Sequence, residues 1–301
     1  MIALEDVDSE SVLRLDGSVQ ARAVLYLDFQ RDGLTGHTVL VGNVQQPPLR
    51  VIRAFPLAGG AVLAHIHNVS GGLLGGDCLH MSVRIGAGAS VQLTTTGATR
   101  VYRPRRNAPV TVQENEFRVA EGALLEYVPD ALIPYASVRF TQRTSIRLSQ
   151  GAGLFWWEIV APGREARGEL FQYECLELKA DVEALGRPIA AENVRLEPQL
   201  RDVSSLARLG PYRYFASFYI CRVGVSPQQW LYVEQQLREL AGRLTRWGHL
   251  LWAVSALVAE GVVVRCLAVH GYEVLPGLFA FWGAAKRILY GCDPTLPRKV
   301  H

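Results

Sequence analysis

Four acidic residues stand in surroundings that are otherwise apolar, and they are the side chains best placed to do chemistry. They are Asp77, Glu126, Asp130 and Glu158. A carboxylate in an apolar strand costs free energy unless it faces solvent, an arginine or a wet cavity. Arg164 and Arg167 follow Glu158 closely and offer it ion pairs. Alternatively, several such oxygens along a water-filled passage would suit a divalent cation in transit, because transit needs weak and exchangeable ligands.

A glycine-rich loop at residues 71–76 comes directly before Asp77. Its glycines permit positive φ angles and a close approach of the backbone, so the loop can hold the next side chain in one place. An Asp in this position most often caps a turn through its own backbone. The functional alternative is a carboxylate held at the wall of an internal cavity. A strand is expected after the loop, so no helix N-terminus is available there to bind a phosphate.

Other metal-binding or catalytic patterns are weak or absent. His65 and His67 lie two residues apart, so on a strand both would point to one face and could chelate a metal, although such residues are more often ordinary polar side chains. The five cysteines are scattered and never form a CxxC pair, which argues against a disulfide framework or a thiolate site. No P-loop, GxGxxG, GxSxG or HExxH pattern occurs, so neither a nucleotide site nor a local nucleophile is indicated.

The elements that must position these residues are mostly strands. Between residues 21 and 200, runs rich in β-forming residues recur about every ten residues, and none shows a sustained helical period. This pattern predicts a mainly β fold, a large multi-stranded scaffold resembling a sandwich, a barrel or a β-solenoid. Residues 81–85 and 90–95 are expected to pair as a hairpin through Gly86, Ala87 and Gly88. The absence of βαβ alternation disfavours Rossmann-like and TIM-barrel folds.

Two helices are expected in the C-terminal third, at residues 227–244 and 277–290. Ser226 and Pro227 have the side chains of an N-cap and a first helical residue, and Gly291 is suited to end the second helix. Residues 250–259 and 262–269 are predicted to form a hairpin, and residues 200–225 a loop that leads into one strand from 214 to 223. One domain spanning residues 1–301, with its strand-rich core at 20–200, accommodates all of these elements.

Composition excludes several classes of protein. The chain has 301 residues, 49% of them hydrophobic and 20% charged, with a net charge of +3, which is typical of a globular protein and too balanced for a nucleic-acid binder. The dense basic cluster at residues 100–106 is interpreted as a solvated loop. No signal-peptide pattern occurs at the N-terminus and no apolar run is long enough to span a bilayer, so a cytoplasmic location is expected.

Six separated motifs point together to one family. They are PPLR at 47–50, SGGLLGGD at 70–77, LTTTGATRVYR at 93–103, LEYVPDALIPY at 125–135, WE at 157–158 with PGR at 162–164 and GELF at 168–171, and PRK at 297–299. In this order they resemble the motifs of the UreD family of urease accessory proteins, called UreH in some organisms. The resemblance is dense over about residues 20–190 and thin elsewhere.

The resemblance implies a β-rich, non-enzymatic scaffold that takes part in urease maturation. Members of the family bind the helical accessory protein UreF, which recruits the nickel-carrying GTPase UreG, and the dimeric accessory complex docks on apo-urease. No cofactor is held permanently, and nickel(II) passes through in transit. Within this family a polar internal route for nickel would use the matched acidic positions Asp77, Glu126, Asp130 and Glu158, with Thr95 as a polar neighbour.

Two hypotheses from other classes compete with this interpretation. One is a β-sandwich hydrolase in which Asp77 and Glu126 form an acid–base pair. The other is a β module that binds a sugar or peptide in a surface groove lined by aromatic residues. Both depend on which side chains converge in space.

Overall fold

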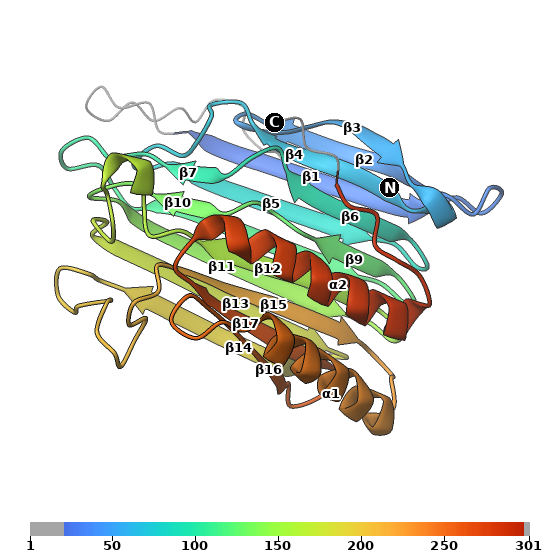
Figure 1. Ribbon diagram of the computed structural model, residues 1–301. Helices are drawn as coiled ribbons and strands as arrows, with labels where there is room; N and C mark the ends of the chain where they lie inside the picture. The colour runs from blue at the N-terminus through green and yellow to red at the C-terminus, as the bar shows by residue number, and fades with distance from the viewer. Residues whose placement is uncertain (1–20, 298–301) are drawn as a thin grey trace.

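Two β-sheets lie face to face, and both α-helices cover the outer side of the larger sheet (Figure 1). The computed structural model describes residues 21–297, so the last two residues of the PRK motif lie outside the described part of the chain. The predicted mainly β fold with two helices is confirmed. None of the described helices is long and apolar enough to cross a membrane.

The two sheets are built from strands that alternate along the chain. The seven-stranded sheet has the order β14 (Arg187–Leu196), β13 (Cys175–Ala184), β11 (Arg139–Leu148), β8 (Thr111–Val119), β5 (Cys78–Ile85), β1 (Arg22–Arg31) and β2 (Thr38–Gln46). The ten-stranded sheet has the order β16 (Leu250–Ala256), β17 (Gly261–Ala268), β15 (Tyr214–Arg222), β12 (Gly153–Val160), β9 (Leu124–Tyr127), β6 (Ser90–Thr95), β4 (Val62–Asn68) and β3 (Leu49–Pro56), with the short strands β7 (Thr99–Val101) and β10 (Leu132–Pro134) at one end.

The middle of the molecule is a parallel β-solenoid. The chain crosses between the sheets at each pass, so β5, β8, β11 and β13 pair in parallel in one sheet, and β4, β6, β9 and β12 in the other. The predicted hairpin at residues 81–95 is therefore wrong, because β5 pairs with β1 and β8 while β6 pairs with β4 and β9. The Gly86–Gly88 turn carries the chain across the sandwich, and each strand buries its inward face in the same core.

Antiparallel strands close the solenoid on both sides. The pairs β1–β2 and β3–β4 lie at one edge of the sheets, and β13–β14 with β15–β17–β16 lie at the other. The β16–β17 hairpin follows the prediction, with Glu260 at a positive φ of 57° in the turn. The strand expected at residues 214–223 is also present, as β15.

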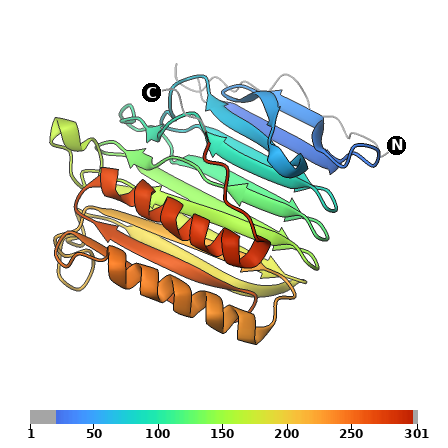
Figure 2. The same ribbon diagram turned by 45° about the vertical axis from the view of Figure 1, so that its right-hand side comes forward.

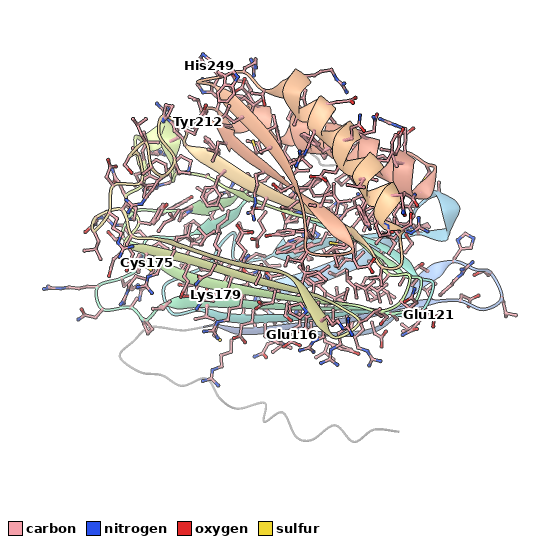
Figure 3. All side chains as sticks on the ribbon, turned by 90° about the horizontal axis from the view of Figure 1, so that it is seen from below. Glu116, Glu121, Cys175, Lys179, Tyr212 and His249 are labelled. Atoms are coloured by element: carbon pink, nitrogen blue, oxygen red, sulfur yellow. The ribbon has the colours of Figure 1, made fainter. Side chains whose placement is uncertain are left out.

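The core has two layers that share the ten-stranded sheet. One layer fills the space between the sheets, and the other lies between the ten-stranded sheet and the helices. Figure 3 shows the stack from below, with Glu116 and Lys179 on the outer face of the seven-stranded sheet, far from the helices. Because side chains alternate along a strand, neighbouring residues of β12 enter different layers: Trp156 points between the sheets and Trp157 points toward the helices.

The helices begin and end largely where the sequence predicts. In α1 (Pro227–Leu244), the Ser226 hydroxyl accepts a hydrogen bond from the Gln229 amide at 3.2 Å, which is the expected N-cap. Helix α2 (Val274–Tyr290) ends at Gly291, with a φ of 70°, and begins three residues earlier than predicted, because Pro276 is tolerated within a first turn. The two helices lie side by side over the ten-stranded sheet (Figure 2).

Candidate functional site

Glu158 points into the space between the two sheets. It follows Trp156 at the next inward position of β12, and Gln142 on the opposite sheet donates a hydrogen bond to its carboxylate. Burial, with a further contribution from the charge of Glu192, raises the pKa of Glu158 from its ordinary value of 4.5 to about 8. The predicted ion pair with Arg164 does not form, because Arg164 pairs with Glu169. Glu158 is therefore a carboxyl group that is largely protonated at neutral pH.

Glu158 lines a narrow cavity, here called the neck, of about 30 Å³. Its polar lining comes from both sheets and from the end of β9, and comprises Thr99, Gln113, Asp130, Gln142 and Glu158. This volume is enough for about one or two water molecules. An occupant of the neck would thus be in direct contact with amide and carboxyl oxygens.

A wider cavity, here called the mouth cavity, adjoins the neck and has a volume of about 250 Å³. It lies between the glycine-rich loop and residues 95–100, and it shares Thr99, Gln113 and Tyr127 with the neck. Thr95 lines it, and the Thr95 hydroxyl accepts a hydrogen bond from the Asp130 amide at 2.9 Å. Thr95 and Asp130 therefore stand where the two cavities meet. A larger groove, of about 820 Å³, lies outside them and also borders Asp130.

On the other side of Glu158 lies a third cavity, here called the edge cavity, of about 350 Å³. It is mostly apolar and opens beside β14 and β16, with Glu192, Ser217 and Arg265 among its lining residues. Ser217 is the register partner of Glu158 across β12 and β15. Arg265 forms an ion pair with Glu192 and donates a hydrogen bond to Ser217 at 2.5 Å. The polar side chains of this cavity are thus engaged with one another, in an ion pair and a hydrogen bond.

Further polar side chains line the interior between the sheets, and the sequence analysis did not single them out. Asn115 donates to the Thr144 hydroxyl at 3.3 Å, and Gln113 donates to Asn115 at 3.1 Å. Their register partners on β11 are Thr144 and Gln142. The available signal was the alternation along residues 111–119, in which Thr111, Gln113 and Asn115 occupy inward positions normally held by apolar residues.

Asp77 is buried, and its carboxylate accepts hydrogen bonds from backbone amides. Its Oδ1 accepts a hydrogen bond from the Ala21 amide at 3.1 Å, and its Oδ2 accepts one from the Leu74 amide at 2.8 Å. It thus caps the glycine-rich loop and ties β1 to it, as the structural interpretation of a Gly-Asp pair predicts. The loop itself is shaped by close contacts: a Cβ on Gly72 would lie 2.6 Å from the Arg100 carbonyl oxygen.

Glu126 lies on the other face of the ten-stranded sheet, under helix α2. Its carboxylate accepts hydrogen bonds from Trp282 Nε1 and Lys286 Nζ, both at 2.8 Å. Burial raises the pKa of Glu126, and the Lys286 cation opposes that rise. Since Glu126 points toward the helix and Glu158 between the sheets, the predicted acidic residues do not all converge. Asp77 and Glu126 do not face each other either, so the acid–base pair of the hydrolase hypothesis finds no support.

His65 and His67 lie on the helix-side face of β4, because their neighbours Ala64 and Ile66 belong to the core between the sheets. Burial, with the nearby charge of His65, lowers the pKa of His67. Among residues 21–297, no three His, Cys, Asp or Glu side chains are grouped closely enough to hold a metal ion together. The candidate site is therefore the pair of neighbouring cavities, with Glu158 in the lining of the neck, Thr95 in that of the mouth cavity and Asp130 in that of the neck.

Comparison with known proteins identifies the family. The family model described as "UreD urease accessory protein" matches residues 21–301. The chain belongs to the UreD family of urease accessory proteins. A urease accessory protein UreD of Herpetosiphon aurantiacus is 44% identical over 88% of this chain and 92% of its own length. The UreD proteins of Actinomyces naeslundii and Cenarchaeum symbiosum are 34% and 33% identical, over 81% and 68% of this chain and 86% and 72% of their own lengths.

Membership of the UreD family gives the chain a role in urease maturation. The family is named for an accessory function and not for a catalytic one, in agreement with the expectation that the protein is not an enzyme. The recognition made from the six motifs is thus confirmed.

Proposed function

We propose that this UreD protein conducts nickel(II) toward urease through the space between its two sheets. The observation that carries the proposal is that the mouth cavity and the neck are neighbours: they share Thr99, Gln113 and Tyr127 in their linings, and Glu158 lines the neck. An oxygen-rich lining without a closed set of ligands suits a cation that must leave again. Of the acidic positions proposed for nickel from the sequence, Glu158 and Asp130 line this path, whereas Asp77 and Glu126 support its walls.

Glu158 would act by exchanging a proton for the metal ion. At neutral pH its carboxyl group is mostly protonated, because its pKa is raised to about 8. A nickel ion entering the neck displaces that proton and gains a carboxylate ligand, and reprotonation then helps to release the ion. Binding stays weak because the ion must compete with the proton. The small volume of the neck also requires the ion to exchange most of its water for protein oxygens.

The partners in this function are proposed from the family. They are the accessory proteins UreF and UreG, which bring the nickel, and apo-urease, which receives it. The complex is expected to contain two copies of each accessory chain.

Reconstitution tests this function. Apo-urease is incubated with nickel, bicarbonate, GTP, UreF, UreG and this chain, and urease activity is measured. Glu158→Gln keeps the size and the hydrogen-bonding capacity of the side chain but cannot ionise. Glu116→Gln, on the outer face of the seven-stranded sheet, is the matched control.

We expect activation to require the chain, to be lowered about tenfold by Glu158→Gln, and to be unaffected by Glu116→Gln. Co-purification of each variant with UreF separates a defect in transfer from a defect in assembly. Equal activation with and without the chain would overturn the proposed function. Full activation by an assembled complex that carries Glu158→Gln would show that Glu158 has no part in nickel transfer.

A further inference from the structure

Exposed arginines lie on β7 and in the loop that follows it, beside the mouth cavity. Arg100 of β7 lines the cavity, and Arg103, Arg105 and Arg106 follow in the loop after β7. No acidic residue occurs between positions 78 and 113 of the sequence. Within the described part of the chain, the side chains of Arg100, Arg105 and Arg106 form no ion pair, while the charge of Arg103 contributes to lowering the pKa of Glu169. The positive charge of this loop is thus left largely uncompensated.

The loop is held firmly, so its arginines are presented in a defined arrangement. The Tyr102 hydroxyl donates a hydrogen bond to the Gly71 carbonyl oxygen at 3.0 Å, and Arg139 donates one to the Ala108 carbonyl oxygen at 2.6 Å. Gly75 packs so closely that a Cβ there would lie 2.8 Å from the side chains of Pro104 and Ala108. The glycine-rich loop and the arginine loop therefore form one structural unit beside β7, at the end of the molecule that carries β7 and β10 (Figure 1).

This charge is the wrong sign for capturing a free metal ion. A hydrated divalent cation that approaches the mouth cavity from solution is repelled by every one of these guanidinium groups. Carboxylates are attracted instead, and Arg can bind them through two parallel hydrogen bonds. An entrance that repels the free ion and attracts carboxylates is suited to transfer from, or to, a protein that covers it.

We propose that Arg100, Arg103, Arg105 and Arg106 dock a carboxylate-rich surface of a partner protein over the mouth cavity. This inference rests on the proposed function, because it assigns a role to the entrance of the same passage. A protein partner fits better than a nucleic acid. The net charge of the chain is only +3, and the aromatic residue of the loop, Tyr102, packs edge-on against Tyr135 and offers no stacking platform.

The test compares two double variants with equal changes in charge. Arg105→Glu with Arg106→Glu alters the arginine loop, and Arg118→Glu with Arg187→Glu alters exposed positions at the opposite ends of the strands. Binding of each variant to purified UreF, UreG and apo-urease is measured by biolayer interferometry at about 0.05 M and about 0.5 M salt. A single-stranded oligonucleotide and a second copy of the chain serve as further probes.

We expect one of the three proteins to lose about tenfold or more in affinity for the arginine-loop variant but not for the control variant, and to bind the wild type more weakly at high salt. Equal binding of both variants to all three proteins would overturn the proposal. So would arginine-dependent binding of the oligonucleotide or of the second copy alone. Because binding is measured without urease activation, a failure here leaves the reconstitution result, and with it the proposed function, to be judged separately.

Discussion

At the scale of single residues, Glu158 and Glu126 show how the same side chain takes different roles on the two faces of one sheet. Glu158 faces the space between the sheets and accepts a hydrogen bond from Gln142, no cation of residues 21–297 contributes to its pKa, and this pKa is raised to about 8. Glu126 is sealed under α2 with Lys286 as its ion-pair partner. The first arrangement leaves a group that can exchange a proton, and the second fixes a helix to a sheet.

The raised pKa of Glu158 makes stability depend on pH in a defined direction. The folded state holds the proton more tightly than the unfolded state, so this stabilisation is complete below about pH 4.5 and is lost as the pH rises to about 8. Glu158→Gln removes the titration. We therefore expect the free energy of unfolding of the variant to increase relative to wild type across this range, by at most about 1.4 kcal/mol per pH unit.

Urea denaturation of both proteins at several pH values between about 5 and 8 measures this difference. The free energy of unfolding of Glu116→Gln should differ from that of wild type by the same amount at every pH. A difference between Glu158→Gln and wild type that does not change with pH would mean that Glu158 is ionised over the whole range.

The buried pair under α2 gives a second prediction. Lys286→Met leaves the Glu126 carboxylate buried with only the Trp282 hydrogen bond, and we expect it to lower the free energy of unfolding by about 3–5 kcal/mol. Adding Glu126→Gln should restore much of this loss, because the buried charge is then gone. Urea denaturation of the single and double variants provides the measurement. A single variant as stable as wild type would show that the pair is not essential for docking the helix.

The sequence singled out four carboxylates in apolar surroundings but not the directions in which they point. Glu126 lies on a strand of four residues in a sheet whose two faces are both buried, so alternation does not separate a core side from a solvent side. In β8, by contrast, the polar residues at inward positions were visible in the sequence and could have predicted the polar interior. The neck could not be predicted, because it joins residues from β8, β11 and β12 whose proximity depends on how the sheets stack.

At the scale of elements, replacing each of two helix glycines by alanine is expected to change stability in opposite directions. Gly277 packs against β16 so closely that a Cβ there would lie 2.1 Å from Trp252 Cζ2, whereas a Cβ on Gly242 of α1 would have no neighbour within 4 Å. We expect Gly277→Ala to cost about 1–3 kcal/mol by overpacking. Gly242→Ala should stabilise by up to about 1 kcal/mol through helix propensity.

Thermal or urea denaturation of the two variants checks the direction of each change in the free energy of unfolding. The comparison is internally controlled, since both changes add one methyl group to a helix. A stabilising effect of Gly277→Ala would mean that α2 can move away from β16 at little cost.

Local signals predicted the helices better than the strand pairing. The Ser226 cap, Pro227 and Gly291 act within a few residues, so the sequence placed α1 correctly and the end of α2 as well. Helix α2 starts at Val274, three residues before the predicted start, and Pro276 lies in its first turn, where proline is tolerated. The prediction of a hairpin at residues 81–95 is wrong for another reason. A glycine turn between two strands looks the same whether the strands pair with each other or lie in different sheets, and the choice is made by distant partners such as β1.

At the scale of the whole molecule, the solenoid explains how a stable protein can keep a few polar side chains between its sheets. Each parallel strand except the short β7 is paired on both sides, and the antiparallel pairs at the edges complete the sheets. The second core layer under α1 and α2 adds apolar burial away from the passage. Polar side chains between the sheets therefore do not have to stabilise the fold alone. The six motifs identified the family, whereas the proposed nickel route depends on how the two sheets stack and has no signature within a single motif.

The most direct test of the central claim is to locate nickel in crystals of the protein by anomalous diffraction at the nickel absorption edge. Crystals would be soaked with Ni²⁺ at about pH 8.5, where most of the Glu158 carboxyl groups are ionised. The account predicts an anomalous peak between the sheets beside Glu158, and its loss in Glu158→Gln crystals. Nickel found only on the outer surface, for example at His65 and His67, with none between the sheets, would contradict it.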